Sequence, residues 1–356
     1  MKDINEGTPA RRCSLASFRH GCREAGSGSF GPIFVFSGNL LTFVLMNRPF
    51  PLLSFRRPAL LLAVASLLLA TGCSAPRAIV ATGKVTPQGE FRVGYNQGFN
   101  IATAPLDKGS AAVKAAASQA ASQQKVDYTE ATTQLQAAAL AYALDPVQPV
   151  ADLSIRYGIV PHLDAGYKYA FGSHVFDAQY QFLGPTGSPE NPGRGAASGT
   201  TYGSLGLQFA TQRTKLPSIP FLSDVNSVLN FRATRHDLLI PLTFSQSFGP
   251  EEEIGAISYG LVYAHSWVSY GFAPTKIYNG SVQVPELPTQ SRNFSSFGSF
   301  VNLKLGYRYF YVIPAVSLFY QNYGDYALLN GQSTSLNGFT VVPSLGFQLR
   351  IPNFTK

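Results

Sequence analysis

The chain of 356 residues is poor in cysteine, methionine and tryptophan, with three, two and one of these residues respectively. Cys13 and Cys22 lie close to the start, so Cys73 stands alone in the remainder and a disulfide framework is excluded there. No apolar run after Cys73 approaches about 18 residues, which excludes membrane-spanning helices. Clustered metal ligands, a nucleotide-binding loop and the Gly-x-Ser-x-Gly elbow of hydrolases are also missing. We therefore expect no metal, no cofactor and no catalytic residues.

The beginning of the chain is built like a targeting region. From Met46 the sequence has three arginines, then an apolar run from Ala59 to Ala70 that is too short to cross a bilayer as a helix. We expect residues 1–45 to be an upstream extension without ordered structure. Residues 46–72 are expected to form a signal peptide that is removed.

The signal peptide ends in the sequence Leu-Ala-Thr-Gly-Cys, residues 69–73. It resembles the lipobox of bacterial lipoproteins, in which the cysteine is lipidated and becomes the new N-terminus, although Ala70 stands where leucine is usual. The resemblance implies a lipid anchor on Cys73, followed by a linker over residues 73–88. The alternative is an ordinary signal peptide cut near the same point.

The positive charge of the chain comes largely from this leader. Residues 1–72 carry a net charge of +5 out of the total of +8, which leaves +3 for the remainder. Because the excess lies in a segment that is removed, it gives no support for nucleic-acid binding.

Residues 297–309 show the pattern that dominates the rest of the chain. Val301, Leu303 and Leu305 are apolar, whereas the residues between them, Asn302 and Lys304, are polar. Side chains alternate between the two faces of a strand, so one face is apolar and the other is polar and charged. Recurrence of this pattern, with aromatic residues near the strand ends, favours a transmembrane β-barrel whose outer face contacts lipid.

The phrase RYGIVPHLDAGYKY, residues 156–169, followed by FDAQYQF, residues 176–182, resembles bacterial outer-membrane β-barrel proteins. In these proteins a strand, a short turn and a second alternating strand recur. A final strand ending near Phe354 is similar to their C-terminal signal. The resemblance implies a fold and a location in the bacterial outer membrane, but no activity.

Together these patterns predict an all-β fold, an antiparallel up-and-down transmembrane barrel of about ten strands within residues 89–356. The expected strands are residues 89–96, three strands within 150–182, and 201–212, 236–248, 255–270, 297–309, 312–322 and 339–351. An Ala-rich stretch without proline or glycine predicts a helical insertion over about 105–146. An alternative assigns this stretch to a periplasmic spacer before a smaller barrel.

The lengths of the connections give the barrel a direction. Long loops would lie on one side and short turns on the other, as in outer-membrane barrels, except that the long loop 184–200 falls on the short-turn side. Pro241, Pro314 and Pro343 lie inside predicted strands, where each removes a backbone donor, so bulges or local strand ends are expected there.

The alternation also predicts which charged residues line the barrel interior. They are Arg92, Asp152, Arg156, Asp164, Lys168, Asp177, Lys304, Arg308 and Arg350. Basic residues exceed acidic ones in this set. Two readings remain open: a core in which the charges pair and no ion passes, or a narrow pore that favours anions.

The sequence thus favours a lipid-anchored outer-membrane barrel that is structural or narrowly porous. A barrel enzyme, either a protease or a lipid-modifying enzyme, is an alternative, but the adjacent His236 and Asp237 point to opposite faces of a strand. A lipocalin-like periplasmic binding barrel is another, with the apolar face turned inward. Expected partners are outer-membrane lipid, lipopolysaccharide and the barrel-assembly machinery, and no nucleic acid.

Overall fold

The computed structural model describes residues 32–35, 42–45, 77–108, 111–127, 129–170, 172–214 and 220–353. The chain forms two units, Met1–Leu60 and Leu61–Lys356. In the first, strands β1 (Pro32–Val35) and β2 (Thr42–Leu45) pair antiparallel, a hairpin that the alternation argument did not identify. The predicted signal peptide and the lipid site at Cys73 lie outside the described residues.

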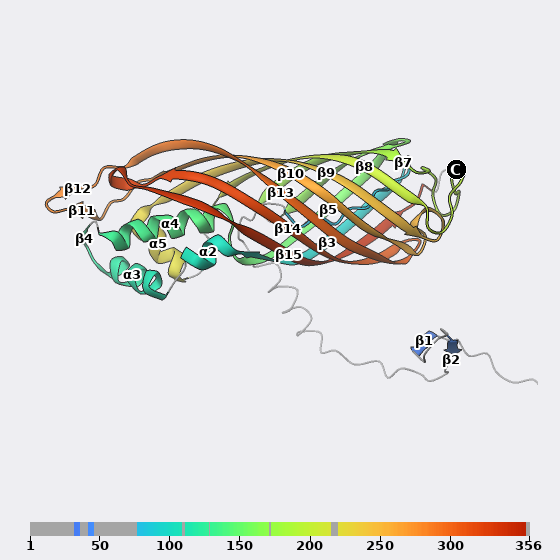
Figure 1. Ribbon diagram of the computed structural model, residues 1–356, viewed down its shortest axis with the longest axis horizontal. Coiled ribbons are helices and arrows are strands. Elements are labelled where there is room, and N and C mark those ends of the chain that lie inside the picture. The colour runs from blue at the N-terminus through green and yellow to red at the C-terminus, as the bar shows by residue number, and fades with distance from the viewer. Residues whose placement is uncertain are drawn as a thin grey trace, which may run out of the picture. The chain divides into compact units, whose positions relative to one another are not determined.

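Ten strands of the second unit close into an antiparallel barrel (Figure 1), which confirms the predicted fold class. They are β3 (Phe91–Ala102), β5 (Gln148–Val160), β6 (Leu163–Ala170), β7 (Ser173–Leu183), β8 (Thr201–Thr214), β9 (Phe231–Phe248), β10 (Gly255–Phe272), β13 (Leu287–Tyr307), β14 (Phe310–Ala327) and β15 (Ser333–Ile351). Neighbours in the barrel are consecutive barrel strands along the chain, and β15 closes the barrel by pairing with β3.

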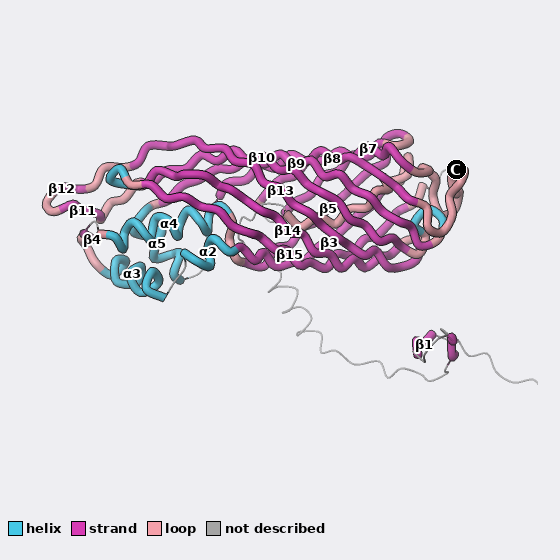
Figure 2. The backbone as a smooth tube through the Cα atoms, in the orientation of Figure 1, coloured by secondary structure: helices cyan, strands magenta, loops and turns pink. Residues whose placement is uncertain are grey.

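The two ends of the barrel differ. We call one the turn end: it holds the β5–β6, β9–β10 and β13–β14 turns, the start of β3 and the end of β15. The other, the helical end, carries the helices that Figure 2 shows gathered together. These are α2 (Thr103–Lys108), α3 (Ala111–Ser122), α4 (Glu130–Leu144) and α5 (Pro220–Leu229). A small sheet of β4 (Val126–Asp127), β11 (Ile277–Asn279) and β12 (Val282–Gln283) lies in the connections.

Three of these helices interrupt one barrel rather than precede it. Because β3 and β5, which flank α2, α3 and α4, pair with each other, the alternative of a spacer before a smaller barrel is wrong. Helix α4 is buried along most of its length, and its apolar residues belong to one cluster with residues of the extended strands. Among the described residues, no helix is long and apolar enough to cross a bilayer.

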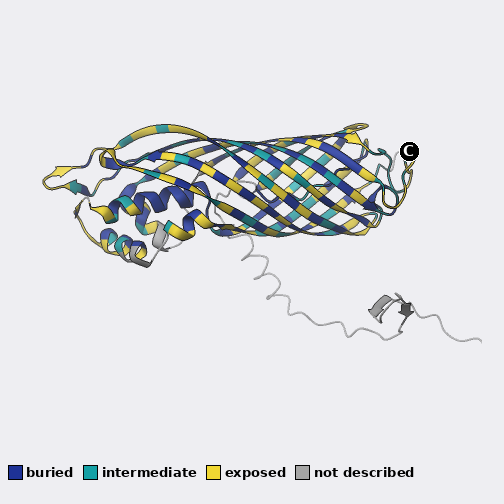
Figure 3. Ribbon diagram, in the orientation of Figure 1, coloured by how far each residue is buried: buried dark blue, intermediate teal, exposed yellow. Residues whose placement is uncertain are grey.

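The barrel wall shows the alternation that the sequence predicts, with apolar side chains outside. Figure 3 shows buried and exposed residues following one another along the strands. Phe297, Val301 and Leu305 of β13 are exposed, whereas Phe300, Asn302 and Lys304 between them are buried. A lipocalin-like barrel needs the opposite arrangement, with apolar side chains lining the inside, so that alternative is excluded.

The outer apolar band has the height of a bilayer core. On β13 it begins at Phe297 and ends at Tyr307, ten residues apart and both exposed. Ten residues span about 34 Å along a strand, which a tilt near 40° reduces to about 26 Å across the membrane. Aromatic residues stand at both edges of this band, as in membrane barrels. The chain is therefore a transmembrane β-barrel of the kind found in bacterial outer membranes.

The three strand prolines interrupt hydrogen bonding without shifting the register. The β8–β9 ladder lacks the pairs around Pro241, the β13–β14 ladder those around Pro314, and the β15–β3 ladder those around Pro343. On either side of each gap the residue pairing is the same. The predicted bulges or strand ends are therefore wrong: a missing N–H is tolerated on one side of a strand because the opposite ladder continues.

We expect a charged residue in the outer band to destabilise the barrel more strongly the deeper it lies in the membrane. Leu261 is exposed in the middle of the β10 part of the band. The substitution Leu261→Arg should therefore destabilise the barrel by about 2–4 kcal/mol. Thr234→Arg, on the outward face of β9 beyond the band, should cost only about 0–1 kcal/mol. Unfolding in denaturant after insertion into lipid vesicles measures both, and equal losses would contradict a lipid-facing band.

Candidate functional site

The interior of the barrel is occupied by the chain itself. Residues 77–90, which precede β3, run through the lumen from the helical end to the turn end, and we call them the plug. The sequence analysis predicted a linker over residues 73–88, and no pattern in the sequence indicated that this segment enters the lumen. At the turn end the plug passes close to Gly158 of β5. A Cβ atom at residue 158 would lie only 2.1 Å from the carbonyl oxygen of Pro87, so only glycine fits at this position.

Backbone groups of the plug are hydrogen-bonded to side chains of the wall at several heights. The N–H of Ile79 donates to Ser317 Oγ at 3.2 Å, that of Gly83 to Ser245 Oγ at 3.0 Å, and that of Thr86 to Asp164 Oδ2 at 2.7 Å. Further bonds join Val85 N–H to Gln181, Asn302 to the carbonyl of Ala81, and Gln179 to the carbonyl of Thr82. An extended segment has no internal partners for these groups, so the wall provides them.

The helical end of the plug is fixed by Asp145, the residue that ends α4. Its buried carboxylate lies 2.5 Å from the guanidinium of Arg77. It also accepts hydrogen bonds from Asn100 at 2.6 Å, Gln321 at 2.7 Å, Tyr323 at 3.0 Å and Thr340. One carboxylate therefore connects the plug, helix α4 and three barrel strands.

A second arginine holds the last turn of α4. Buried Arg235 donates to the carbonyl of Leu144 at 2.5 Å and pairs with Asp237 at 2.7 Å. Cations next to the last carbonyls of a helix are favourable because those groups lack intrahelical partners. Helix α4 is in this way seated on the barrel interior.

The two sides of the lumen differ in polarity. Ile79 packs against an apolar cluster of Leu239, Val262, Phe300 and Phe319 on strands β9, β10, β13 and β14. Towards β3, β5, β6 and β7, a polar cavity of about 90 Å³ remains beside the plug. It is large enough to hold water.

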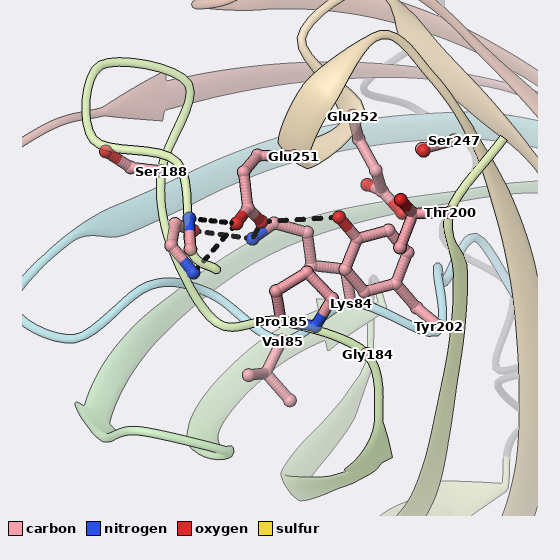
Figure 4. A network of polar contacts seen from close by, with 12 residues as sticks. Lys84, Val85, Gly184, Pro185, Ser188, Thr200, Tyr202, Ser247, Glu251 and Glu252 are labelled. Carbon is pink, nitrogen blue, oxygen red and sulfur yellow. Dashed lines mark hydrogen bonds and ion pairs between the residues drawn. The ribbon is translucent and has the colours of Figure 1, made fainter. Parts of the chain in front are cut away.

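At the turn end the β9–β10 connection folds inward and brings two carboxylates into the lumen. Glu251, in the short helix η1 (Pro250–Glu252), is buried 2.5 Å from Lys84 Nζ (Figure 4). It also accepts hydrogen bonds from the N–H groups of Gly187 and Gly193 and from Tyr202. Neighbouring Glu252 pairs with Lys304 at 3.0 Å.

These contacts explain the long loop on the short-turn side, residues 184–200. Its backbone binds Glu251, and the carbonyl of Gly187 accepts from Lys84 at 2.6 Å. Its Glu190 pairs with Arg350, which also holds Glu90 at 2.7 Å. The hydrogen bond from Arg350 lowers the pKa of Glu190 from 4.5 to about 2. The loop therefore closes the turn end of the barrel.

Eight of the nine charged residues predicted to line the interior lie on the inner face of the strands. Arg92, Asp152, Asp164, Lys304 and Arg350 are buried there, and Arg156, Lys168 and Asp177 line the polar cavity. Arg156 joins Asp164 at 2.5 Å and also pairs with Asp177. The guanidinium of Arg92 donates to the carbonyls of Lys84 and Val85 in the plug.

Arg308 is the exception. It lies in the β13–β14 turn with a backbone φ of 50°, and pairs with Glu253 at 2.6 Å near the outside of the turn end. The alternation of Tyr307, Arg308 and Tyr309 looked like the continuation of a strand, but β13 ends at Tyr307. Arg308 therefore does not line the interior.

The alternation missed the residues that balance the charge. Among the described residues, eight basic and eight acidic side chains now face the lumen. The additional ones are Arg77, Lys84 and Arg235, and Glu90, Asp145, Asp237, Glu251 and Glu252. Most lie in the plug, a turn or a helix end, where no alternation marks them. The positive excess behind the anion-pore reading is therefore absent.

The adjacent histidine and aspartate considered for a barrel enzyme lie on opposite faces of β9. His236 is exposed on the outer face of β9, whereas Asp237 is buried inside, as the sequence indicated. No group of three or more potential metal ligands occurs among the described residues.

Comparisons with known proteins assign no family. No family model and no curated protein matches the chain. Among solved structures, Ail of Yersinia pestis matches at 10% identity over 75% of this chain and 100% of its own, with a TM-score of 0.26. A major outer membrane protein of Thermus thermophilus matches at 10% over 73% and 99%, TM-score 0.29. The translocator domain of the autotransporter NalP from Neisseria meningitidis matches at 6% over 82% and 94%, TM-score 0.31. The fold assignment therefore rests on the strand pairing and the outer surface.

The buried ion pair of Lys84 and Glu251 should contribute more to the free energy of unfolding than a half-exposed ion pair. Lys84→Met leaves Glu251 buried without its cation, so we expect a loss of about 3–5 kcal/mol in the free energy of unfolding. The double variant Lys84→Met/Glu251→Gln should lose less. Arg308→Gln, in the half-exposed pair with Glu253, should cost about 0–1 kcal/mol. Denaturant unfolding in detergent micelles measures all three, and a Lys84→Met loss as small as that of Arg308→Gln would contradict this role.

Proposed function

We propose that this chain is a lipid-anchored outer-membrane barrel that is closed at rest and serves as a structural platform rather than an open pore. The observation that carries the proposal is the plug. Its backbone is bonded to the wall, and its Arg77, Lys84 and Glu90 are ion-paired with Asp145, Glu251 and Arg350. Ions can pass only when the plug moves.

Pairing of the charges supports the closed reading further. The plug and the side chains that bind it occupy much of the lumen, and the charges around the lumen balance. Moving the plug would leave several buried charges unpaired at once, each at a cost of several kcal/mol. Spontaneous opening is therefore rare. Catalysis has no part in the proposal, and the expected partners are membrane lipid and the assembly machinery.

The helices form the surface that the proposed platform would present to the outside of the cell. In outer-membrane barrels the long connections lie outside the cell and the short turns face the periplasm. The helical end then faces outward, with α3 and α5 packed on α4 above the barrel.

Plug removal tests the closed state directly. In planar bilayers the intact protein should show no steady conductance steps. A variant lacking residues 77–88 should show small steps, because the lumen loses the plug and loop 184–200 loses the Lys84 contacts that help hold it over the turn end. Glu251→Ala/Asp145→Ala, which frees both ends of the plug but keeps it, should show brief openings. The heat-dependent gel shift of folded barrels verifies that each variant folds. Steps from the intact protein, or a folded deletion variant without conductance, would overturn the proposal.

The lipid anchor on Cys73 belongs to the same proposal. It is supported by the sequence Leu-Ala-Thr-Gly-Cys at residues 69–73, which resembles a lipobox.

Labelling with palmitate tests the anchor. Cys73→Ala should lose the label but keep the folded, heat-modifiable barrel, since contacts of Arg77 and of the residues after it hold the plug. Persistent labelling of the variant would show that Cys73 is not the acylation site.

A further inference from the structure

The barrel wall has a notch at its helical end, between β13 and β14. Their ladder runs from the pair Tyr307–Phe310 to the pair Ser296–Gln321 and then stops, although both strands continue. Beyond that point β13 pairs only with β10, through Asn293 and Trp267 among others, and β14 pairs only with β15. The two hairpins therefore separate above the apolar band.

A bulge in β14 produces the separation. The β14–β15 register shifts between Asn322 and Gly324. Gly324 has φ of +78°, a conformation that glycine adopts without strain, and its N–H donates to Asn322 Oδ1 at 3.1 Å. On the inner side, Phe294 and Tyr323 close the notch by edge contact, with ring centroids 5.0 Å apart. The notch is thus a cleft in the outer surface rather than an opening into the lumen.

The cleft has the size and lining of a ligand site. Its volume is about 700 Å³, within the usual range for small-molecule pockets of about 300–1,000 Å³. Its outward-facing lining carries an indole ring, two hydroxyls, an amide and a carboxylate: Trp267, Ser269, Ser291, Asn293 and Asp325. These groups include both hydrogen-bond donors and acceptors, and an aromatic face stands beside them. A molecule rich in hydroxyls, with both apolar and polar faces, matches this set; sugars have that chemistry.

The position of Trp267 indicates where the sugar comes from. Trp267 lies at the upper edge of the apolar band, paired across the strands with His236 and Asn293. Tryptophan is enriched at this membrane interface, where lipid headgroups lie. The ring of His265 packs edge-on against the indole, with the ring centroids 4.6 Å apart. His265 Nδ1 is hydrogen-bonded to Ser295 Oγ at 3.0 Å, and these contacts fix the orientation of the indole.

We propose that the β13–β14 cleft binds the sugar headgroup of a glycolipid in the leaflet around the helical end. This inference rests on the proposed membrane placement of the barrel. Trp267 stacks on the sugar ring, and outward-facing Asn293 and Asp325, on the two sides of the cleft, hydrogen-bond its hydroxyls.

Trp267 is the only tryptophan in the chain, so its fluorescence reports on the cleft directly. The protein is reconstituted in phosphatidylethanolamine vesicles with increasing fractions of lipopolysaccharide. We expect a saturable change in intensity or emission maximum. Asn293→Ala and Asp325→Ala should each weaken it at least tenfold. Tyr320→Ala, an outward aromatic residue of the same band that does not line the cleft, should leave it unchanged.

The remaining outcomes separate the possible failures. A properly inserted protein with no change, or with the same change in the cleft variants, overturns the site but not the barrel. An equal change with free core oligosaccharide and no glycolipid overturns the membrane source. Failure to insert, judged by the heat-dependent gel shift, overturns the proposed function itself.

Discussion

A barrel of ten strands is too narrow to hydrate many charges, yet its inner face carries Arg92, Lys304 and Arg350 among others. Leaving one buried charge unpaired costs several kcal/mol, so the inward cations need carboxylates or, for Arg92, backbone carbonyls as partners. The strands alone do not supply enough of them. The plug, the inward β9–β10 turn and the end of α4 contribute Glu90, Glu251, Glu252 and Asp145. The main features of the structure follow from this need.

Both ends of the barrel are closed by the same principle with different elements. At the helical end, Asp145 joins the plug to α4 and the strands, while Arg235 holds the last turn of that helix. At the turn end, Glu251 gathers the plug lysine and the loop 184–200. The apolar contacts of Ile79 between these ends require no pairing and fill one side of the lumen. A closed barrel is therefore the arrangement in which the interior charges are satisfied.

Alternation along strands is a local property, and it predicted what is local. It placed the ten strands, the apolar outer face and eight of the nine lumen charges, because each depends only on which way neighbouring side chains point. The plug has no such pattern, since its neighbours lie far away in sequence: Arg77 contacts Asp145 and Gln321. Glu251 and Glu252 lie in a turn, and Arg308 looked like part of a strand although it lies in the turn between two. The charge balance could therefore not be read from the strands alone.

The central claim is that residues 77–90 occupy the lumen, and cross-linking tests it most directly. In a background without native cysteines, Ala81→Cys is combined with Asn302→Cys, whose native side chain bonds the carbonyl of Ala81 at 2.8 Å. The control pairs Ala81→Cys with Val301→Cys, one residue away on the outer face. With a short dithiol-reactive cross-linker on the membrane-inserted protein, the account predicts a cross-linked band, resolved after denaturation, for the first pair alone. No cross-link in either pair, or equal cross-linking in both, would contradict it.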